Sequence, residues 1–237
     1  MLKKLRLLIF VLQLLCISIA SAQVVAEKPV VNFNRAIGQQ SRLFNGPGYD
    51  FYPFLSDTSA YFQNLRTFEK GTVVYDGYAY TDIPILYDLH KDLVVTLSHD
   101  SVGKFSLLSE RISDFYQNGH HFIRVVKADT SADSPANSGF YELMYDGKVK
   151  ILLKRYKNIE ETTSSMEYKK YFVPGQNYFL LKDQVYYKVN SENAFMAAFG
   201  ARKKDFQRYL KEKHIKFRKT PELALLTLAD YYDHLPN

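Results

Sequence analysis

Short runs of alternating hydrophobic and polar residues, separated by turn residues, dominate the chain from Gly71 to about residue 190. Two Asp-Gly pairs, Asp76-Gly77 and Asp146-Gly147, lie between such runs. Asp-Gly supplies the positive φ angles of a two-residue type I′ turn, so each pair predicts a β-hairpin. The runs that these turns join are 72–75 with 78–80, and 140–145 with 148–155.

The second arm of the later hairpin has the alternation of a half-buried strand. Its inward set is Val149, Ile151 and Leu153, and its outward set is Lys148, Lys150 and Lys154. The pattern predicts an antiparallel strand with one face in water. A third hairpin is predicted where 178–181 meets 185–189 across Lys182-Asp183-Gln184.

Further short strands are predicted between the hairpins, and Pro84, which has no amide hydrogen, is expected at a strand start, a bulge or a sheet edge. Residues 128–139 are expected to form a loop or a hairpin tip. Around ten to twelve regularly spaced strands predict a mainly β fold of the α+β class, as an antiparallel meander, a sandwich or an open barrel. The additional strands are expected at 85–89, 93–97, 104–108, 112–116 and 121–126.

The final quarter of the chain changes to a helical period. Ser191 is a candidate N-cap for a helix that ends near Gly200, and Thr220-Pro221 marks the start of a last helix. We expect a C-terminal cap of two to three helices packed on the sheet, with partner binding as the alternative for the apolar stripe of the last helix. The apolar faces are Phe206, Tyr209 and Leu210 in the middle helix, and Leu225, Leu228, Ala229 and Tyr232 in the last.

Aromatic residues are frequent, with 19 Tyr and 17 Phe but no Trp, a composition that favours strands. Several gather directly after the turn signal at 45–48 without a helical or strand period. They are expected to cover one edge of the core. Members of this group are Tyr49, Phe51, Tyr52, Phe54, Tyr61 and Phe62.

The chain begins with the three parts of a secretory signal. These parts are the basic residues Lys3, Lys4 and Arg6, the mostly apolar run 7–19, and the small-residue site Ala20-Ser21-Ala22. This order predicts a signal peptide at 1–22 that is cleaved between Ala22 and Gln23. The apolar run of 13 residues is shorter than the roughly 20 that a membrane-spanning helix needs.

Lipidation at Cys16 and a retained anchor are the alternatives to cleavage. Cys16 is the only cysteine, so cleavage excludes disulfides, thiolate metal ligands and a cysteine nucleophile from the mature chain. Removing 22 of the 237 residues leaves 215, which suffices for one well-packed core. We expect an extended leader at 23–48, an antiparallel β domain at 49–190 and C-terminal helices at 191–237.

Positive charge is concentrated near the C-terminus. The net charge is +6, and it falls to +3 without the three cations of the signal. Residues 200–219 hold nine basic and two acidic residues, a net charge of +7. Such a window predicts contact with an anionic surface, with a solvated helix face as the alternative and no nucleic acid expected. The candidate contact residues are Lys203, Lys204, Arg208 and Lys211.

No motif in the sequence predicts catalysis, a metal site or a cofactor. His99-Asp100-Ser101 are contiguous and cannot adopt the geometry of a hydrolase triad. His120 and His121 would project to opposite faces of a strand, so they cannot hold one metal from one side. We therefore expect no enzyme activity, although a carboxylate pair for glycoside hydrolysis stays open among the 25 acidic residues.

Several motifs together resemble a family of secreted Bacteroidetes proteins with no assigned activity. They are Leu43-Phe44-Asn45-Gly46 with Tyr49, the run from Gly71 to Tyr75-Asp76-Gly77 with Tyr80, Tyr87-Asp88-Leu89 with Asp92, and the 178–189 hairpin. Asp100-Ser101-Val102 also resembles the short O-glycosylation motif of such bacteria. The resemblance implies export in a two-membrane cell, to the periplasm or the outer-membrane surface. It assigns no catalytic residue.

These expectations together describe an exported, non-catalytic envelope-accessory or binding module that is not an integral membrane protein after cleavage. The candidate ligand-binding residues are Tyr75, Tyr78, Tyr80 and Tyr87, with core packing and cross-strand pairing as the alternative for these rings. The alternative functions are a periplasmic carrier of a lipid or hydrophobic ligand and a hydrolase of envelope glycans.

Overall fold

The fold is known from a computed structural model, in which one compact unit begins at Leu43. The predicted signal peptide and most of the predicted leader lie outside the described residues. The structure describes residues 43, 45–54, 56–98, 101–127, 136–163 and 168–235.

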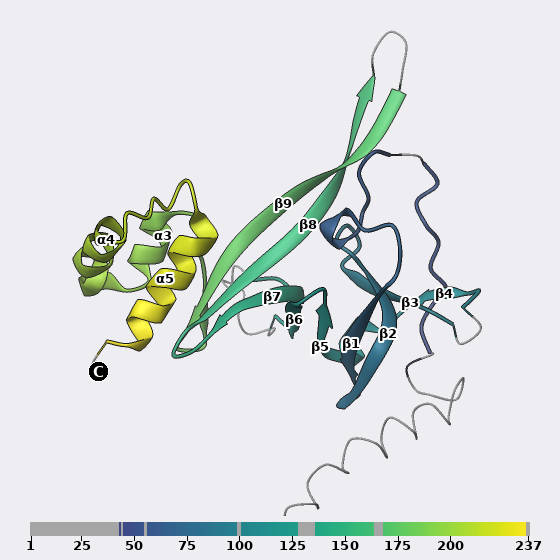
Figure 1. Ribbon diagram of the computed structural model, residues 1–237, viewed down its shortest axis with the longest axis horizontal. Coiled ribbons are helices and arrows are strands. Elements are labelled where there is room, and N and C mark those ends of the chain that lie inside the picture. The colour runs from purple at the N-terminus through teal and green to yellow at the C-terminus, as the bar shows by residue number, and fades with distance from the viewer. Residues whose placement is uncertain are drawn as a thin grey trace, which may run out of the picture. The chain divides into compact units, whose positions relative to one another are not determined.

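Ten antiparallel strands form one open sheet in the order β10-β9-β8-β7-β6-β5-β1-β2-β3-β4 (Figure 1). Because β5 pairs with β1, two meanders extend outward from the middle of the sheet. The prediction of a mainly β, antiparallel meander is confirmed. The strands are β1 (Glu69–Tyr75), β2 (Tyr78–Asp88), β3 (Leu93–Leu97), β4 (Lys104–Ser106), β5 (Ile112–Gln117), β6 (His120–Val125), β7 (Gly139–Asp146), β8 (Lys150–Thr163), β9 (Tyr168–Lys182) and β10 (Val185–Lys188).

Two of the three predicted hairpins have two-residue turns, the first as expected and the third one residue shorter than expected. Asp76 and Gly77 have φ angles of 50° and 78°, as a type I′ turn requires. Asp183 and Gln184, with φ angles of 51° and 63°, form the same kind of turn between β9 and β10. Both hairpins are confirmed, and the remaining one also forms, because β7 and β8 pair antiparallel.

The prediction of a two-residue turn at Asp146-Gly147 is wrong, because a longer loop separates β7 from β8. The Lys148 amide donates to Asp233 Oδ1 at 3.0 Å and to Oδ2 at 3.2 Å. A Cβ on Gly147 would lie 1.8 Å from the same carboxylate, so the close approach requires glycine. A partner 85 residues away therefore shapes this turn.

Pro84 lies inside a single strand that replaces the two predicted at 78–80 and 85–89. It pairs with Lys70 of β1. Pairing of β2 with β3 begins only at Ile85, so on that side Pro84 lies at an unpaired part of the strand. A missing amide hydrogen disrupts no ladder bond there.

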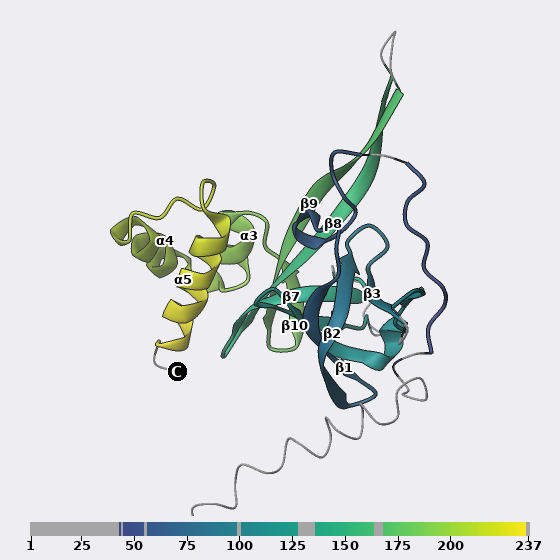
Figure 2. The ribbon, with the colours of Figure 1, turned by 45° about the vertical axis from the view of Figure 1, so that its right-hand side comes forward.

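The predicted C-terminal cap is confirmed, with three α-helices that lie together beside β7 to β10 (Figure 2). Ser191 Oγ accepts a hydrogen bond from the Ala194 amide at 3.2 Å, as predicted for an N-cap. The helices are α3 (Glu192–Ala197), α4 (Lys203–Glu212) and α5 (Pro221–Asp233), and short 3₁₀ turns occur at η3 (Phe62–Asn64), η4 (Ser109–Arg111) and η5 (Gly200–Arg202).

Both faces of β8 are covered where β8 passes under the helices. Val149, Ile151 and Leu153 pack against the helical cap, as the alternation predicts. Leu152 points to the opposite face and is also fully buried, in a cluster with Tyr141 and Phe179. The expectation of one wet face is therefore wrong for this part of the strand.

Substitution of Leu225 tests the packing of α5 on the sheet. Leu225 is fully buried, whereas Leu223 on the same helix is 52 % exposed. We expect Leu225→Ala to lower the free energy of unfolding by about 2–4 kcal/mol, because it leaves a cavity. Leu223→Ala should change it by less than about 0.5 kcal/mol. Urea unfolding of both variants measures the difference, and equal effects would contradict the assigned helix orientation.

Candidate ligand-binding cleft

The segment that precedes β1 runs along the sheet edge before it reaches the end of β2. Its backbone extends the pairing of β4, with the Tyr49 amide 2.9 Å from Lys104 O and the Ser106 amide 3.0 Å from Pro47 O. A Cβ on Gly46 would lie 1.8 Å from the carbonyl oxygen of Ser106, so only glycine permits this approach. The segment is thus fixed at its start by main-chain bonds.

A buried carboxylate at the end of β2 fixes the next part of the segment. Asp88 is fully buried, and its Oδ2 accepts from the hydroxyls of Tyr49 at 2.6 Å and Tyr52 at 2.8 Å. Its Oδ1 accepts from the amides of His90 at 2.8 Å and Lys91 at 2.9 Å. Four donors compensate the loss of water around the charge.

A buried amine on β8 fixes the far end of the same segment. Lys157 is 5 % exposed, and its Nζ donates to Ser59 O at 2.6 Å and to Tyr61 O at 2.9 Å. The third bond reaches Asn64 Oδ1 at 2.5 Å. All three ammonium hydrogens therefore have acceptors, and the segment is held against both β2 and β8.

Burial sets the protonation of this network. It raises the pKa of Tyr49 and Tyr52, and the Asp88 carboxylate raises both further, so the two hydroxyls stay protonated donors. Burial lowers the pKa of Lys157 to about 8, against the attraction of Asp88. The network therefore contains donors on the tyrosines and one ionisable amine near neutral pH.

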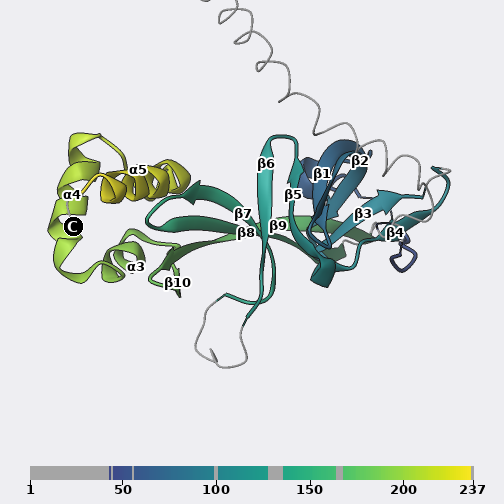
Figure 3. The same ribbon diagram turned by 90° about the horizontal axis from the view of Figure 1, so that it is seen from below.

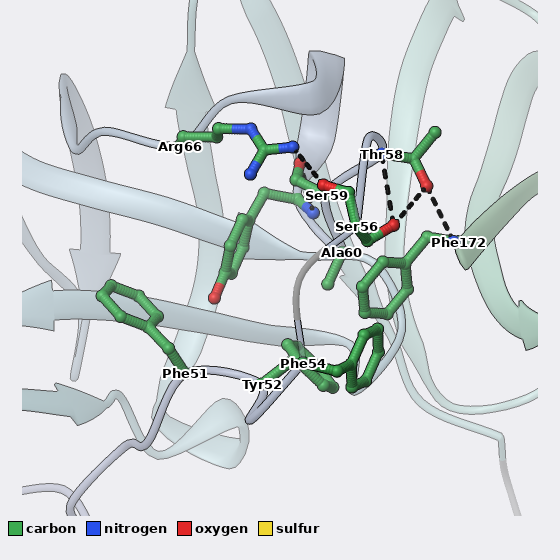
Figure 4. Close-up of a pocket in the computed structure, with 10 residues that line it drawn as sticks. Phe51, Tyr52, Phe54, Ser56, Thr58, Ser59, Ala60, Arg66 and Phe172 are labelled. Carbon is green, nitrogen blue, oxygen red and sulfur yellow. Dashed lines mark hydrogen bonds between the residues drawn. The ribbon is translucent and has the colours of Figure 1, made fainter. Parts of the chain in front are cut away.

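The anchored segment forms the walls of an aromatic cleft of about 240 Å³ (Figure 4). The rings of Phe54 and Phe172 stack at a centroid distance of 5.4 Å, and Tyr52 meets Phe172 edge-on at 4.9 Å. Phe51, 44 % exposed, stands apart from this pair across the hollow. The cleft is lined by Phe51, Tyr52, Phe54, Ser56, Thr58, Ser59, Ala60, Tyr61, Arg66 and Phe172.

Polar groups border the aromatic walls. Thr58 Oγ1 accepts from the Phe172 amide at 2.8 Å, which joins the segment to β9. Arg66 Nη2 donates to Ser56 O at 2.5 Å and to Asp57 O at 3.1 Å. A guanidinium has five N–H donors. Those on Nε and Nη1 make no hydrogen bond with the described residues, so they can face a ligand.

A second cleft, of about 440 Å³, lies between η3 and the β8–β9 ribbon. Its charged groups already have partners. Arg155 donates to Glu142 at 2.6 Å and lies 3.9 Å from Glu222, and Lys157 is saturated. The aromatic cleft therefore offers a ligand more charged N–H donors without a partner among the described residues than the larger cleft does.

The four tyrosines singled out from the sequence do not form one surface. Tyr75, Tyr80 and Tyr87 are at most 7 % exposed and belong to an aromatic core with Phe115. Their rings are not accessible to a ligand at the surface. Tyr78 is 55 % exposed, at the start of β2 beside the Asp76-Gly77 turn. The cleft instead uses the aromatic group after residue 48, whose dense but aperiodic rings were the available sequence signal.

The histidines have separate partners. His120 Nδ1 lies 2.6 Å from Glu142 Oε1, whereas His121 Nε2 lies 3.3 Å from Asp114 Oδ1, consistent with opposite faces of β6. His99 and Asp100 lie outside the described residues, and Ser101 is exposed. Across the part of the chain that the structure describes, no group of three or more His, Cys, Asp or Glu could hold a metal ion.

The basic residues singled out from the sequence are all exposed. They are Lys203, Lys204, Arg208 and Lys211, on α4. Arg208 pairs with Asp205 at 2.9 Å. None of the described helices has both the length and the apolar character needed to cross a membrane.

The buried amine predicts a pH dependence of stability. Between about pH 8 and pH 9 the folded Lys157 loses its proton while the unfolded one, with a pKa of 10.5, retains it. The unfolded state then binds more protons, so Lys157 should make the free energy of unfolding rise with pH in this window. Above about pH 9 the tyrosines oppose the rise, because burial raises their pKa in the folded state while the unfolded side chains, with a pKa of 10.0, begin to ionise.

Urea unfolding across that window tests this expectation in Lys157→Met. The rise should be smaller in this variant, and it should persist in Lys70→Met, whose side chain is 81 % exposed. If the free energy of unfolding depended on pH in Lys157→Met as it does in the wild type, the amine of Lys157 would have an ordinary pKa.

The comparisons with known proteins add no family. No protein-family model matches the chain, and no curated protein or solved structure matches it significantly. The resemblance to secreted Bacteroidetes proteins therefore stays a prediction, and a function must be argued from the cleft.

Proposed function

We propose that the chain is an exported, non-catalytic binding module whose aromatic cleft takes one sugar ring of an envelope glycan. The observation that carries this proposal is the cleft itself: aromatic walls, an exposed Phe51 and a polar rim on a segment fixed by buried hydrogen bonds. Export rests on the predicted signal peptide at 1–22.

The size of the cleft supports a single ring. Pockets for drug-sized ligands measure roughly 300–1,000 Å³. The aromatic cleft, at about 240 Å³, is smaller and open to solvent. It would bind one ring of a longer polymer and leave the flanking units outside.

The chemistry of the walls fits a sugar ring. A pyranose has an apolar C–H face and a rim of hydroxyl groups. The exposed ring of Phe51 offers an aromatic surface across from the stacked rings of Phe54 and Phe172, and the N–H donors of Arg66 suit a carboxylate or a hydroxyl at the rim. An acidic sugar such as N-acetylmuramic acid satisfies both features.

The residues that line the cleft favour binding over hydrolysis. Glycoside hydrolysis requires two carboxyl groups beside the bond that breaks. The described lining contains no Asp or Glu. Asp88, behind Tyr52, is fully buried and already accepts four hydrogen bonds.

The lipid-carrier alternative would need a space between the sheet and the helices. Where the structure describes this region, side chains fill it, including fully buried Leu180, Phe195 and Phe206. Native mass spectrometry that found an uncharged lipid retained after mild purification would contradict the proposed glycan module.

Substitution of Phe51 tests the cleft. The probe is the soluble disaccharide of N-acetylglucosamine and N-acetylmuramic acid, titrated by calorimetry or NMR. We expect Phe51→Ala to weaken binding about tenfold, a loss of about 1.4 kcal/mol, because the ring covers the sugar face. Tyr78→Ala removes an exposed ring outside the cleft lining and should bind as the wild type does.

Two results would contradict the proposal. One is the absence of disaccharide binding to the wild-type chain. The other is an equal loss in Phe51→Ala and Tyr78→Ala, which would show that binding does not depend on the cleft.

A further inference from the structure

The helical cap has an exposed basic face that is not part of the cleft. In Figure 3 α4 lies at the opposite end of the described unit from β1 to β4. The helix is strongly amphipathic: Phe206 and Leu210 are buried, and its other face is basic. We propose that this basic face docks on an anionic lipid bilayer.

The cations of α4 share one face. At about 100° per residue, Lys204, Arg208 and Lys211 fall within an arc of roughly 60°, on the side opposite Phe206 and Leu210. All three side chains are exposed. Asp205 and Glu212 pair with Arg208, at 2.9 Å and 3.8 Å, and lie at the border of this arc. The centre of the face therefore stays positive.

The connection from α4 to α5 adds further exposed cations to the helical cap. Phe217 is 5 % exposed within the helical core, and the Ile215 amide donates to Leu210 O at 2.9 Å, so this connection is held in place. Its cations are presented by a fixed backbone and not by a free tail. They are Lys213, Lys216, Arg218 and Lys219, all exposed.

The aromatic residues of this region favour lipid over nucleic acid. Single-stranded nucleic acid is held by bases stacked on free aromatic rings. Here Phe206 and Phe217 are buried, and Tyr209 is stacked on Tyr231 at 4.0 Å. Among the described residues, the positive charge of this region is thus exposed without free aromatic rings beside it.

Vesicle cosedimentation tests the proposal. The probes are phosphatidylcholine vesicles with and without phosphatidylglycerol, at about 0.1 M and about 1 M NaCl, where the Debye length is about 10 Å and 3 Å. We expect binding only to the anionic vesicles at the lower salt concentration. Each cation near such a surface contributes about fivefold in partitioning. The triple variant Lys204→Gln, Arg208→Gln, Lys211→Gln should therefore bind about 100-fold more weakly.

A matched control separates this surface from net charge. The triple variant Lys70→Gln, Arg111→Gln, Lys169→Gln removes the same charge from exposed residues outside the helical cap and should retain vesicle binding. Three results would overturn the proposal: no binding to anionic vesicles, equal losses in both triple variants, or binding of an oligonucleotide but not of vesicles. The disaccharide titration of the cleft is independent of all three.

Discussion

The buried carboxylate of Asp88 is the interaction on which the cleft depends. A charged group without water is costly unless it is fully hydrogen-bonded, and two of its four donors are hydroxyls from the segment before β1. Removing either hydroxyl would leave part of the charge uncompensated. Because the buried charge needs these hydrogen bonds, Tyr49 and Tyr52 stay in place. Their positions in turn fix the aromatic walls of the cleft.

Lys157 completes this arrangement from the other side. It joins carbonyl oxygens of the same segment to β8, so one segment bridges strands from both meanders of the sheet. Phe172, on β9, enters the cleft at the point where the β8–β9 ribbon extends past its neighbours. The cleft thus exists because β2, β8 and β9 are tied together by one irregular segment, while the helical cap independently covers the far part of the sheet.

Local signals explain what the sequence predicts well. The turn at Asp76-Gly77 and the cap at Ser191 depend on residues close in the chain, and both are observed. The cleft depends on pairs far apart: Asp88 lies 39 residues from Tyr49, and Lys157 lies 98 residues from Ser59. Contacts between residues so far apart in the chain produce no periodic pattern in the sequence. The long ribbon was missed for a related reason, because its outer part is polar on both faces, as at Glu160 and Glu161.

Amide hydrogen exchange in Asp88→Asn tests most directly whether the buried carboxylate fixes the cleft. The amide nitrogen of asparagine cannot accept hydrogen bonds from the hydroxyls of Tyr49 and Tyr52. The segment before β1 should therefore loosen, while the core under the helices stays intact. We expect faster exchange at the amides of Tyr49 and Leu89, which donate to Lys104 O and Ala60 O, and unchanged protection at the amide of Leu180. Unchanged exchange at Tyr49 and Leu89 would contradict this expectation.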